Sequence, residues 1–103
     1  MREQKFFTIK SGTKLISLPI DTVTHVQGLK DYAIIFTVDK KYVIKGYIKT
    51  VESILPKGFF TRVHKSFIVA NSKIKIINRS RIEFENYQIP IGRMYKNAVE
   101  AML

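Results

Sequence analysis

The segment from Phe60 to Val69 places side chains that can bind an anion between apolar residues. Arg62 and Lys65 are cationic, and His64 and Ser66 can donate hydrogen bonds. The apolar residues between them can anchor the backbone in a core, which would leave the polar side chains at the surface. Because no acidic residue adjoins this segment, it should attract a polyanion, and a phosphate backbone is the commonest one.

The charge of the whole chain supports this interpretation. Its 103 residues include 18 Lys or Arg and 8 Asp or Glu, which gives a net charge of +10. Residues 53–82 contain seven Lys or Arg and no acid. Charge alone is compatible with double-stranded DNA, with RNA and with an acidic protein partner. Most aromatic residues fall in apolar pairs or on apolar faces, with Tyr32 and Tyr95 as exceptions, which disfavours a stacking surface for single strands.

The composition gives no support to an enzyme or a metal site. The chain has no Cys, and neither His25 nor His64 belongs to a motif with a nucleophile and an orienting carboxylate. If the segment above is one strand, His64 and Ser66 share a face, but no acid lies near them in sequence. We therefore expect no catalytic residue, no metal and no cofactor. The glycines are interpreted as isolated turn residues rather than a phosphate loop: Gly12, Gly28, Gly46, Gly58 and Gly92.

The length predicts one domain over residues 1–103, and the absence of Cys fits the cytoplasmic location that we expect. An apolar content of 46% can supply a small independent core. No run approaches the roughly 18 apolar residues of a membrane span, and the first ten residues are too polar for a signal peptide.

Apolar and polar residues alternate in several short segments, as they do in half-buried strands. These segments lie near residues 7–9, 16–20, 74–76 and 82–84. In one of them, Lys73 and Lys75 should lie on the face opposite Ile74 and Ile76. A longer β-branched run precedes a tight turn, so residues 32–45 should form a hairpin.

Two segments have helical spacing instead. The first carries apolar residues at positions 48, 51, 54 and 55, and Pro56 ends it. The second runs from Arg93 to Leu103 and carries four apolar residues on one predicted face: Met94, Ala98, Ala101 and Met102. The chain should therefore be mainly β, with a short middle helix and a C-terminal helix.

Three motifs, in order and spacing, resemble the LytTR family of bacterial DNA-binding domains over about residues 5–100. The first is Gly28 to Tyr32 with the β-rich run that follows. The second is the middle helix with Leu55-Pro56 and the segment from Phe60 to Val69, and it is the most specific. The third is Ile89 to Tyr95, which opens the terminal helix. The chain has Gln27, Ala70 and Gly92 where the family often has Glu, Asn and Ser, and Gly92 removes a hydroxyl that could bind phosphate.

The resemblance implies several small antiparallel sheets packed side by side, with loops at one edge entering successive major grooves. It places the base-reading positions on Tyr32, Lys65 and Arg93. Arg and Lys can donate to the O6 and N7 atoms of guanine, and Tyr can donate a hydrogen bond or contact a thymine methyl. The phosphate contacts expected from this chain are Lys30, Arg62, His64, Ser66, Lys73 and Lys96.

The resemblance also implies partners. The expected ligand is double-stranded DNA, bound by two copies of the domain on imperfect direct repeats, because copies one or two helical turns apart share a face of the duplex. Such domains usually follow the receiver domain of a two-component response regulator, so a receiver fused before this chain is a further expectation. The function expected is that of a bacterial transcription regulator.

Overall fold

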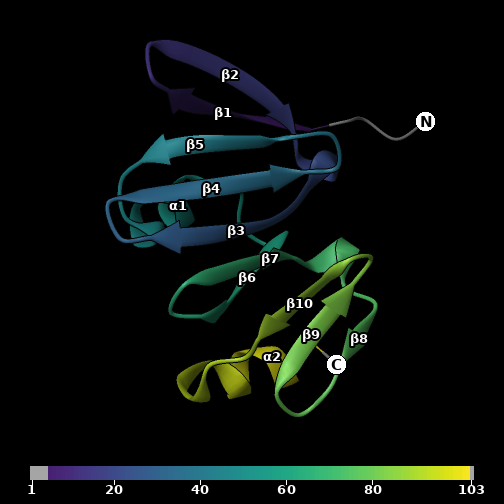
Figure 1. Ribbon diagram of the computed structural model, residues 1–103. Helices are drawn as coiled ribbons and strands as arrows, with labels where there is room; N and C mark the ends of the chain where they lie inside the picture. The colour runs from purple at the N-terminus through teal and green to yellow at the C-terminus, as the bar shows by residue number, and fades with distance from the viewer. Residues whose placement is uncertain (1–4, 103) are drawn as a thin grey trace, which may run out of the picture.

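The computed structural model describes residues 5–102, which form ten strands, two α-helices and three 3-10 helices (Figure 1). The strands are β1 (Phe6–Ser11), β2 (Lys14–Pro19), β3 (Val23–Leu29), β4 (Tyr32–Thr37), β5 (Lys41–Lys45), β6 (Phe60–His64), β7 (Phe67–Ala70), β8 (Ile76–Ile77), β9 (Arg81–Phe84) and β10 (Tyr87–Pro90). The α-helices are α1 (Ile48–Ile54) and α2 (Lys96–Glu100). The 3-10 helices are Ile20–Thr22, Asn71–Lys73 and Arg93–Tyr95.

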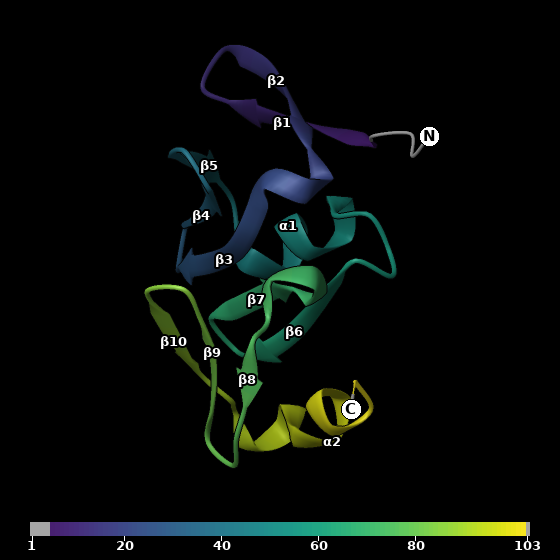
Figure 2. The ribbon, with the colours of Figure 1, turned by 90° about the vertical axis from the view of Figure 1, so that its right-hand side faces the viewer.

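The strands make three antiparallel sheets. β1 and β2 form a hairpin, β5-β4-β3-β7-β6 form a five-stranded sheet, and β10-β9-β8 form a three-stranded sheet. Figures 1 and 2 show the three sheets following one another down the molecule, with α1 behind the five-stranded sheet and α2 below it. The predicted class, mainly β with short antiparallel sheets side by side, is confirmed.

Two hydrophobic cores hold the sheets together, and β7 contributes to both. The first core lies between the β1–β2 hairpin, α1 and one face of the five-stranded sheet, and it includes Ile68. The second lies between β6, β7, the three-stranded sheet and α2, and it includes Val69. Since neighbouring residues of a strand point to opposite faces, β7 ties the two cores together. The other buried members of the second core are Val63, Ile82, Phe84, Ile89 and Val99.

Gly28 is not a turn glycine, as its isolated position had suggested, but lies within β3. A Cβ atom there would come within 2.7 Å of the Cβ of Ile48, the first residue of α1. The missing side chain therefore lets α1 pack directly on β3. Gly12 and Gly58, with φ values of 64° and 90°, do lie in turns.

The strand predicted near residues 74–76 is shorter and begins later. Asn71–Lys73 form a 3-10 helix, closed by a hydrogen bond from Ile74 N–H to Asn71 O of 3.4 Å, so only Ile76–Ile77 pair with β9. The prediction that Ile74 and Ile76 share one face of a strand is therefore wrong. Ile76 is 53% exposed, whereas Ile74 packs against the second core.

The C-terminal helix also differs from its prediction. Arg93–Tyr95 are a 3-10 helix, and the α-helix covers only Lys96–Glu100. The tighter first turn shifts the helical phase, so that Met94 is 91% exposed and Val99 is the buried residue.

No helix among residues 5–102 has the length and apolar character needed to cross a bilayer. Within the same residues, no three metal-ligating side chains come together.

Candidate nucleic-acid interface

Two tight turns lie side by side at one end of the five-stranded sheet. Lys30-Asp31 connects β3 to β4, and Lys65-Ser66 connects β6 to β7. The second turn shows that residues 60–69 are a hairpin and not one strand, with His64 paired to Phe67. Because β3 pairs with β7, the Gly28 N–H donates to Ser66 O at 2.8 Å, which fixes one turn against the other.

The segment around Arg93 docks beside the Lys65-Ser66 turn. The Gly92 N–H donates to Val63 O of β6 at 2.8 Å, and the guanidinium carbon of Arg62 lies 5.7 Å from the centre of the Tyr95 ring. A Cβ on Gly92 would come within 3.0 Å of the Tyr95 ring and 3.4 Å of the His64 Cα. Glycine therefore permits this close approach, which a Ser at this position would crowd.

The three segments thus form one edge of the molecule, at the left of Figure 1. Tyr32 is 48% exposed, and Lys65 and Arg93 are also exposed. Lys30 adopts a left-handed φ of 59°, as the two-residue turn between β3 and β4 requires. The structure therefore brings the three predicted base-reading residues to one edge.

A family model described as the LytTr DNA-binding domain matches residues 13–103. The chain belongs to the LytTr DNA-binding domain family. Among solved structures, the domain is similar to a "LytTr DNA-binding domain of putative methyl-accepting/DNA response regulator from Bacillus cereus", with a TM-score of 0.76 over 97% of each chain. The sequence identity is 23%, so this likeness shows the fold. A search among curated proteins finds no match.

In this LytTr domain, Arg62 is engaged with the protein itself, which its sequence position did not reveal. Its Nε donates to His64 O at 2.8 Å, and its Nη2 donates to Lys65 O at 2.6 Å. Its Nη1 forms a salt bridge of 2.8 Å with Glu52 on α1. The guanidinium therefore holds the Lys65-Ser66 turn in shape, while its face meets Tyr95.

His64 also stabilises this turn. Its Nδ1 accepts a hydrogen bond of 3.0 Å from the Ser66 N–H, so the ring proton of the neutral form lies on Nε2. Burial lowers the pKa of His64, and the nearby charges of Lys65 and Arg62 lower it further. The residue therefore meets solvent as a neutral hydrogen-bond donor and not as a cation.

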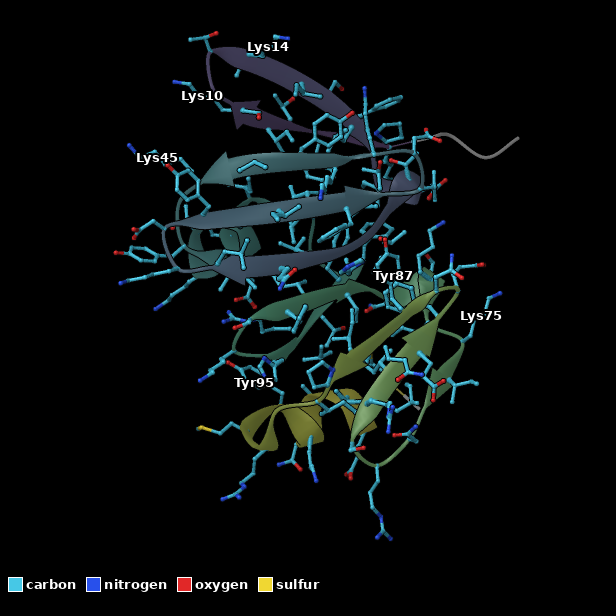
Figure 3. The ribbon with its side chains drawn as sticks, viewed as in Figure 1. Lys10, Lys14, Lys45, Lys75, Tyr87 and Tyr95 are labelled. Atoms are coloured by element: carbon cyan, nitrogen blue, oxygen red, sulfur yellow. The ribbon has the colours of Figure 1, made fainter. Side chains whose placement is uncertain are left out.

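Lys73 is the one predicted phosphate contact that the structure does not bring to this edge. It ends the 3-10 helix that follows β7, at the opposite end of that strand from Lys65. It lines a pocket with Val38, Glu85 and Tyr87, and Tyr87 lies on the right of Figure 3 while Tyr95 lies on the left. Lys30, Ser66 and Lys96 remain at or beside the three segments.

Arg62→Lys is expected to destabilise the domain by about 2 kcal/mol, because a lysine keeps the charge but loses the fork that binds two carbonyls and Glu52 at once. Chemical denaturation measures the loss, and amide exchange at Lys65 and Ser66 should accelerate. Arg81→Lys is the matched control, since Arg81 is exposed and its side chain bonds to Gln88 on the neighbouring strand. If both variants lose the same stability, Arg62 does not have the positioning role described here.

Proposed function

We propose that this domain binds double-stranded DNA through the edge formed by the β3–β4 turn, the β6–β7 turn and the segment around Arg93. It would do so as the effector domain of a bacterial transcription regulator in the cytoplasm. The observation that carries the proposal is the alignment of two β-turns and the Arg93 segment, each fixed to the next by backbone hydrogen bonds. Membership of the LytTr DNA-binding domain family supports it.

Tyr32, Lys65 and Arg93 are assigned to base reading, because each is exposed on its own segment and carries donors suited to base edges. The side chains assigned to phosphate are Lys30, His64, Ser66 and Lys96, which surround the base readers. We assign Arg62 to positioning the turn, and we leave Lys73 out of the interface.

A second copy of the domain on a tandem direct repeat completes the arrangement, because two copies can touch only when they occupy the same face of the duplex. The Bacillus cereus relative is described as part of a putative response regulator. That description supports a regulator of the same kind here, with a receiver domain supplying the input signal.

The proposal is tested by measuring binding to a labelled duplex against salt concentration. Lys30, Lys65, Arg93 and Lys96 give the edge four cations, and each neutralised phosphate contributes about 0.9 to the slope of log K against log[salt]. We therefore expect a slope of about −4 or steeper. A slope shallower than about −2 would contradict the proposed interface.

The same titration distinguishes the competing ligands. Duplex DNA should bind more tightly than single-stranded DNA or RNA at equal salt, because Tyr32, Lys65 and Arg93 carry hydrogen-bond donors suited to base edges in a groove. Preferential binding of RNA, or of a polyglutamate peptide as an acidic protein mimic, would favour the alternative of a basic module with another partner.

A further inference from the structure

We infer that the DNA-binding edge extends beyond the three segments onto a lysine ridge formed by Lys10, Lys14 and Lys45, which contacts the phosphates flanking the bases that are read. The inference rests on the proposed function and adds an interaction surface to it. It concerns only the backbone of the duplex, because the ridge lies beyond the three segments that are assigned to the groove, and lysines there would meet phosphates.

The strand pairing of the protein places the lysine ridge in line with the base-reading residues. Lys45, the last residue of β5, is the direct cross-strand partner of Tyr32. Beyond β5, the Ser11 hydroxyl donates to Val43 O at 2.8 Å, which holds the β1–β2 hairpin against this strand. Lys10 and Lys14 lie at the tip of that hairpin, at either side of its turn. In Figure 3 all three lysines lie on the same side of the molecule as Tyr95, and Lys75 and Tyr87 lie on the other side.

The dimensions of the domain match a longer contact with DNA. Two of its principal extents are 40 and 39 Å. At 3.4 Å per base pair, a face of that length covers about 12 base pairs, which is slightly more than one helical turn. Neighbouring strands lie about 4.8 Å apart, so Lys45 is about 14 Å from the turn that begins β7. A lysine ridge that starts at Lys45 can therefore reach the DNA backbone on the far side of the groove that the three segments occupy.

The β1–β2 hairpin carries lysines without an acid of its own, whereas the lysines of the opposite edge lie beside acids. Residues 5–20, which include the whole β1–β2 hairpin, contain no acid. All three ridge lysines are exposed, and neither salt bridge among residues 5–102 involves them. On the opposite edge, Lys75 pairs with Glu85 at 3.1 Å, and Lys40 and Lys41 directly follow Asp39. A polyanion therefore meets more cations than acids along this edge, where Asp31 of the β3–β4 turn is the acid nearest to the ridge in the strand pairing.

The test compares two triple variants with equal loss of charge. The ridge variant is Lys10→Gln, Lys14→Gln and Lys45→Gln, and the control is Lys40→Gln, Lys41→Gln and Lys75→Gln on the opposite edge. Lys41 and Lys45 are the first and last residues of β5. The two triple variants therefore lose the same charge at opposite edges, and a difference between them reports where the charge lies. The readouts are the salt slope, measured on a duplex selected by the wild-type domain and on a random duplex, and the hydroxyl-radical footprint on the selected duplex.

The ridge variant should have a slope shallower by about 2 to 3 on both duplexes, and its footprint should shorten at one end. The control should change the slope by less than about 1. Equal changes in the two variants would overturn the ridge while leaving the proposed function intact. Failure of the wild-type domain to bind any duplex would overturn both. Thermal melting checks that each variant is folded. The comparison is repeated with smaller changes, using Lys45→Gln alone and the double variant Lys10→Gln, Lys14→Gln.

Discussion

Acidification from pH 7 to pH 4 should lower the free energy of unfolding by about 3 kcal/mol through His25 alone. His25 is 3% exposed on β3 and stacks on Phe36, with ring centres 4.2 Å apart. The rings of Phe84 and Tyr87, from β9 and β10, lie 5.4 and 4.4 Å away, so His25 joins the five-stranded sheet to the three-stranded sheet. Burial in this aromatic setting lowers its pKa from 6.5 to about 4.

The direction of the effect follows from where the proton binds. The folded-state pKa lies below the unfolded value, so between pH 6.5 and about 4 the unfolded chain binds a proton that the folded chain excludes. The contribution of neutral His25 to the free energy of unfolding is complete above pH 6.5. It is lost as the pH falls from 6.5 to about 4, and it is gone below that pH. Neutral His25 is compatible with its hydrogen bond of 2.8 Å to the Thr24 hydroxyl, which itself donates to Phe36 O.

The measurement is denaturant unfolding at several pH values for the wild-type domain and for His25→Phe. Phenylalanine retains the aromatic contacts and removes the titration, so the stability difference between pH 7 and pH 4 should be smaller in the variant by about 3 kcal/mol. His64, whose pKa is also lowered, and the pocket-lining Lys73 and Glu85 occur in both proteins, so their effects cancel. Parallel stability curves for the two proteins would contradict the role given to His25.

Arg93→Ala should weaken binding to a selected duplex by about 1 to 3 kcal/mol, which is roughly 10-fold to 100-fold, and relax the preference at one base pair. Arg93 is exposed at the first position of a 3-10 helix, and Gly92 fixes that position against β6. Its side chain can therefore project past the sheet into a groove and bind a guanine edge with two hydrogen bonds.

Paired titrations against the selected duplex and a random duplex, at one fixed salt concentration, measure this effect. Lys96→Ala is the control, because Lys96 is exposed three residues later on α2 and is assigned to phosphate. It should weaken binding to both duplexes by similar amounts. If Arg93→Ala also weakened both equally, the base-reading role would have to be abandoned.

The fold could be predicted from sequence wherever local pattern determines structure. The alternation around Ile9 and Ile82, the hairpin over residues 32–45 and the helical spacing of Ile48 and Val51 each depend on near neighbours in sequence, and each is found in the structure. The family motifs supplied the arrangement of the sheets, which no periodicity encodes.

What sequence could not supply depends on contacts between distant residues. The sequence indicates a turn glycine at Gly28, and only the packing of α1 on β3 shows why a glycine is needed there. It likewise indicates a free cation at Arg62, whose hydrogen bonds to Glu52 and to the Lys65 carbonyl are visible only in the folded structure. A buried histidine such as His25 has no local signature either, because its aromatic partners come from three other strands. The strand predicted from Lys73 onward is wrong for a different reason, since a 3-10 helix and the start of a strand can share one polar–apolar pattern.

The pairing of β3 with β7 has a consequence for how the domain folds. The pairings β1–β2, β3–β4, β4–β5, β6–β7, β8–β9 and β9–β10 each join strands that are neighbours in sequence. Among the described strands, only β3–β7 brings together segments about 40 residues apart. Closing that long loop is entropically slow compared with forming hairpins. The turns at Tyr32 and at Lys65 come from opposite sides of this junction, so the two turns can act as one recognition surface only after this long loop has closed.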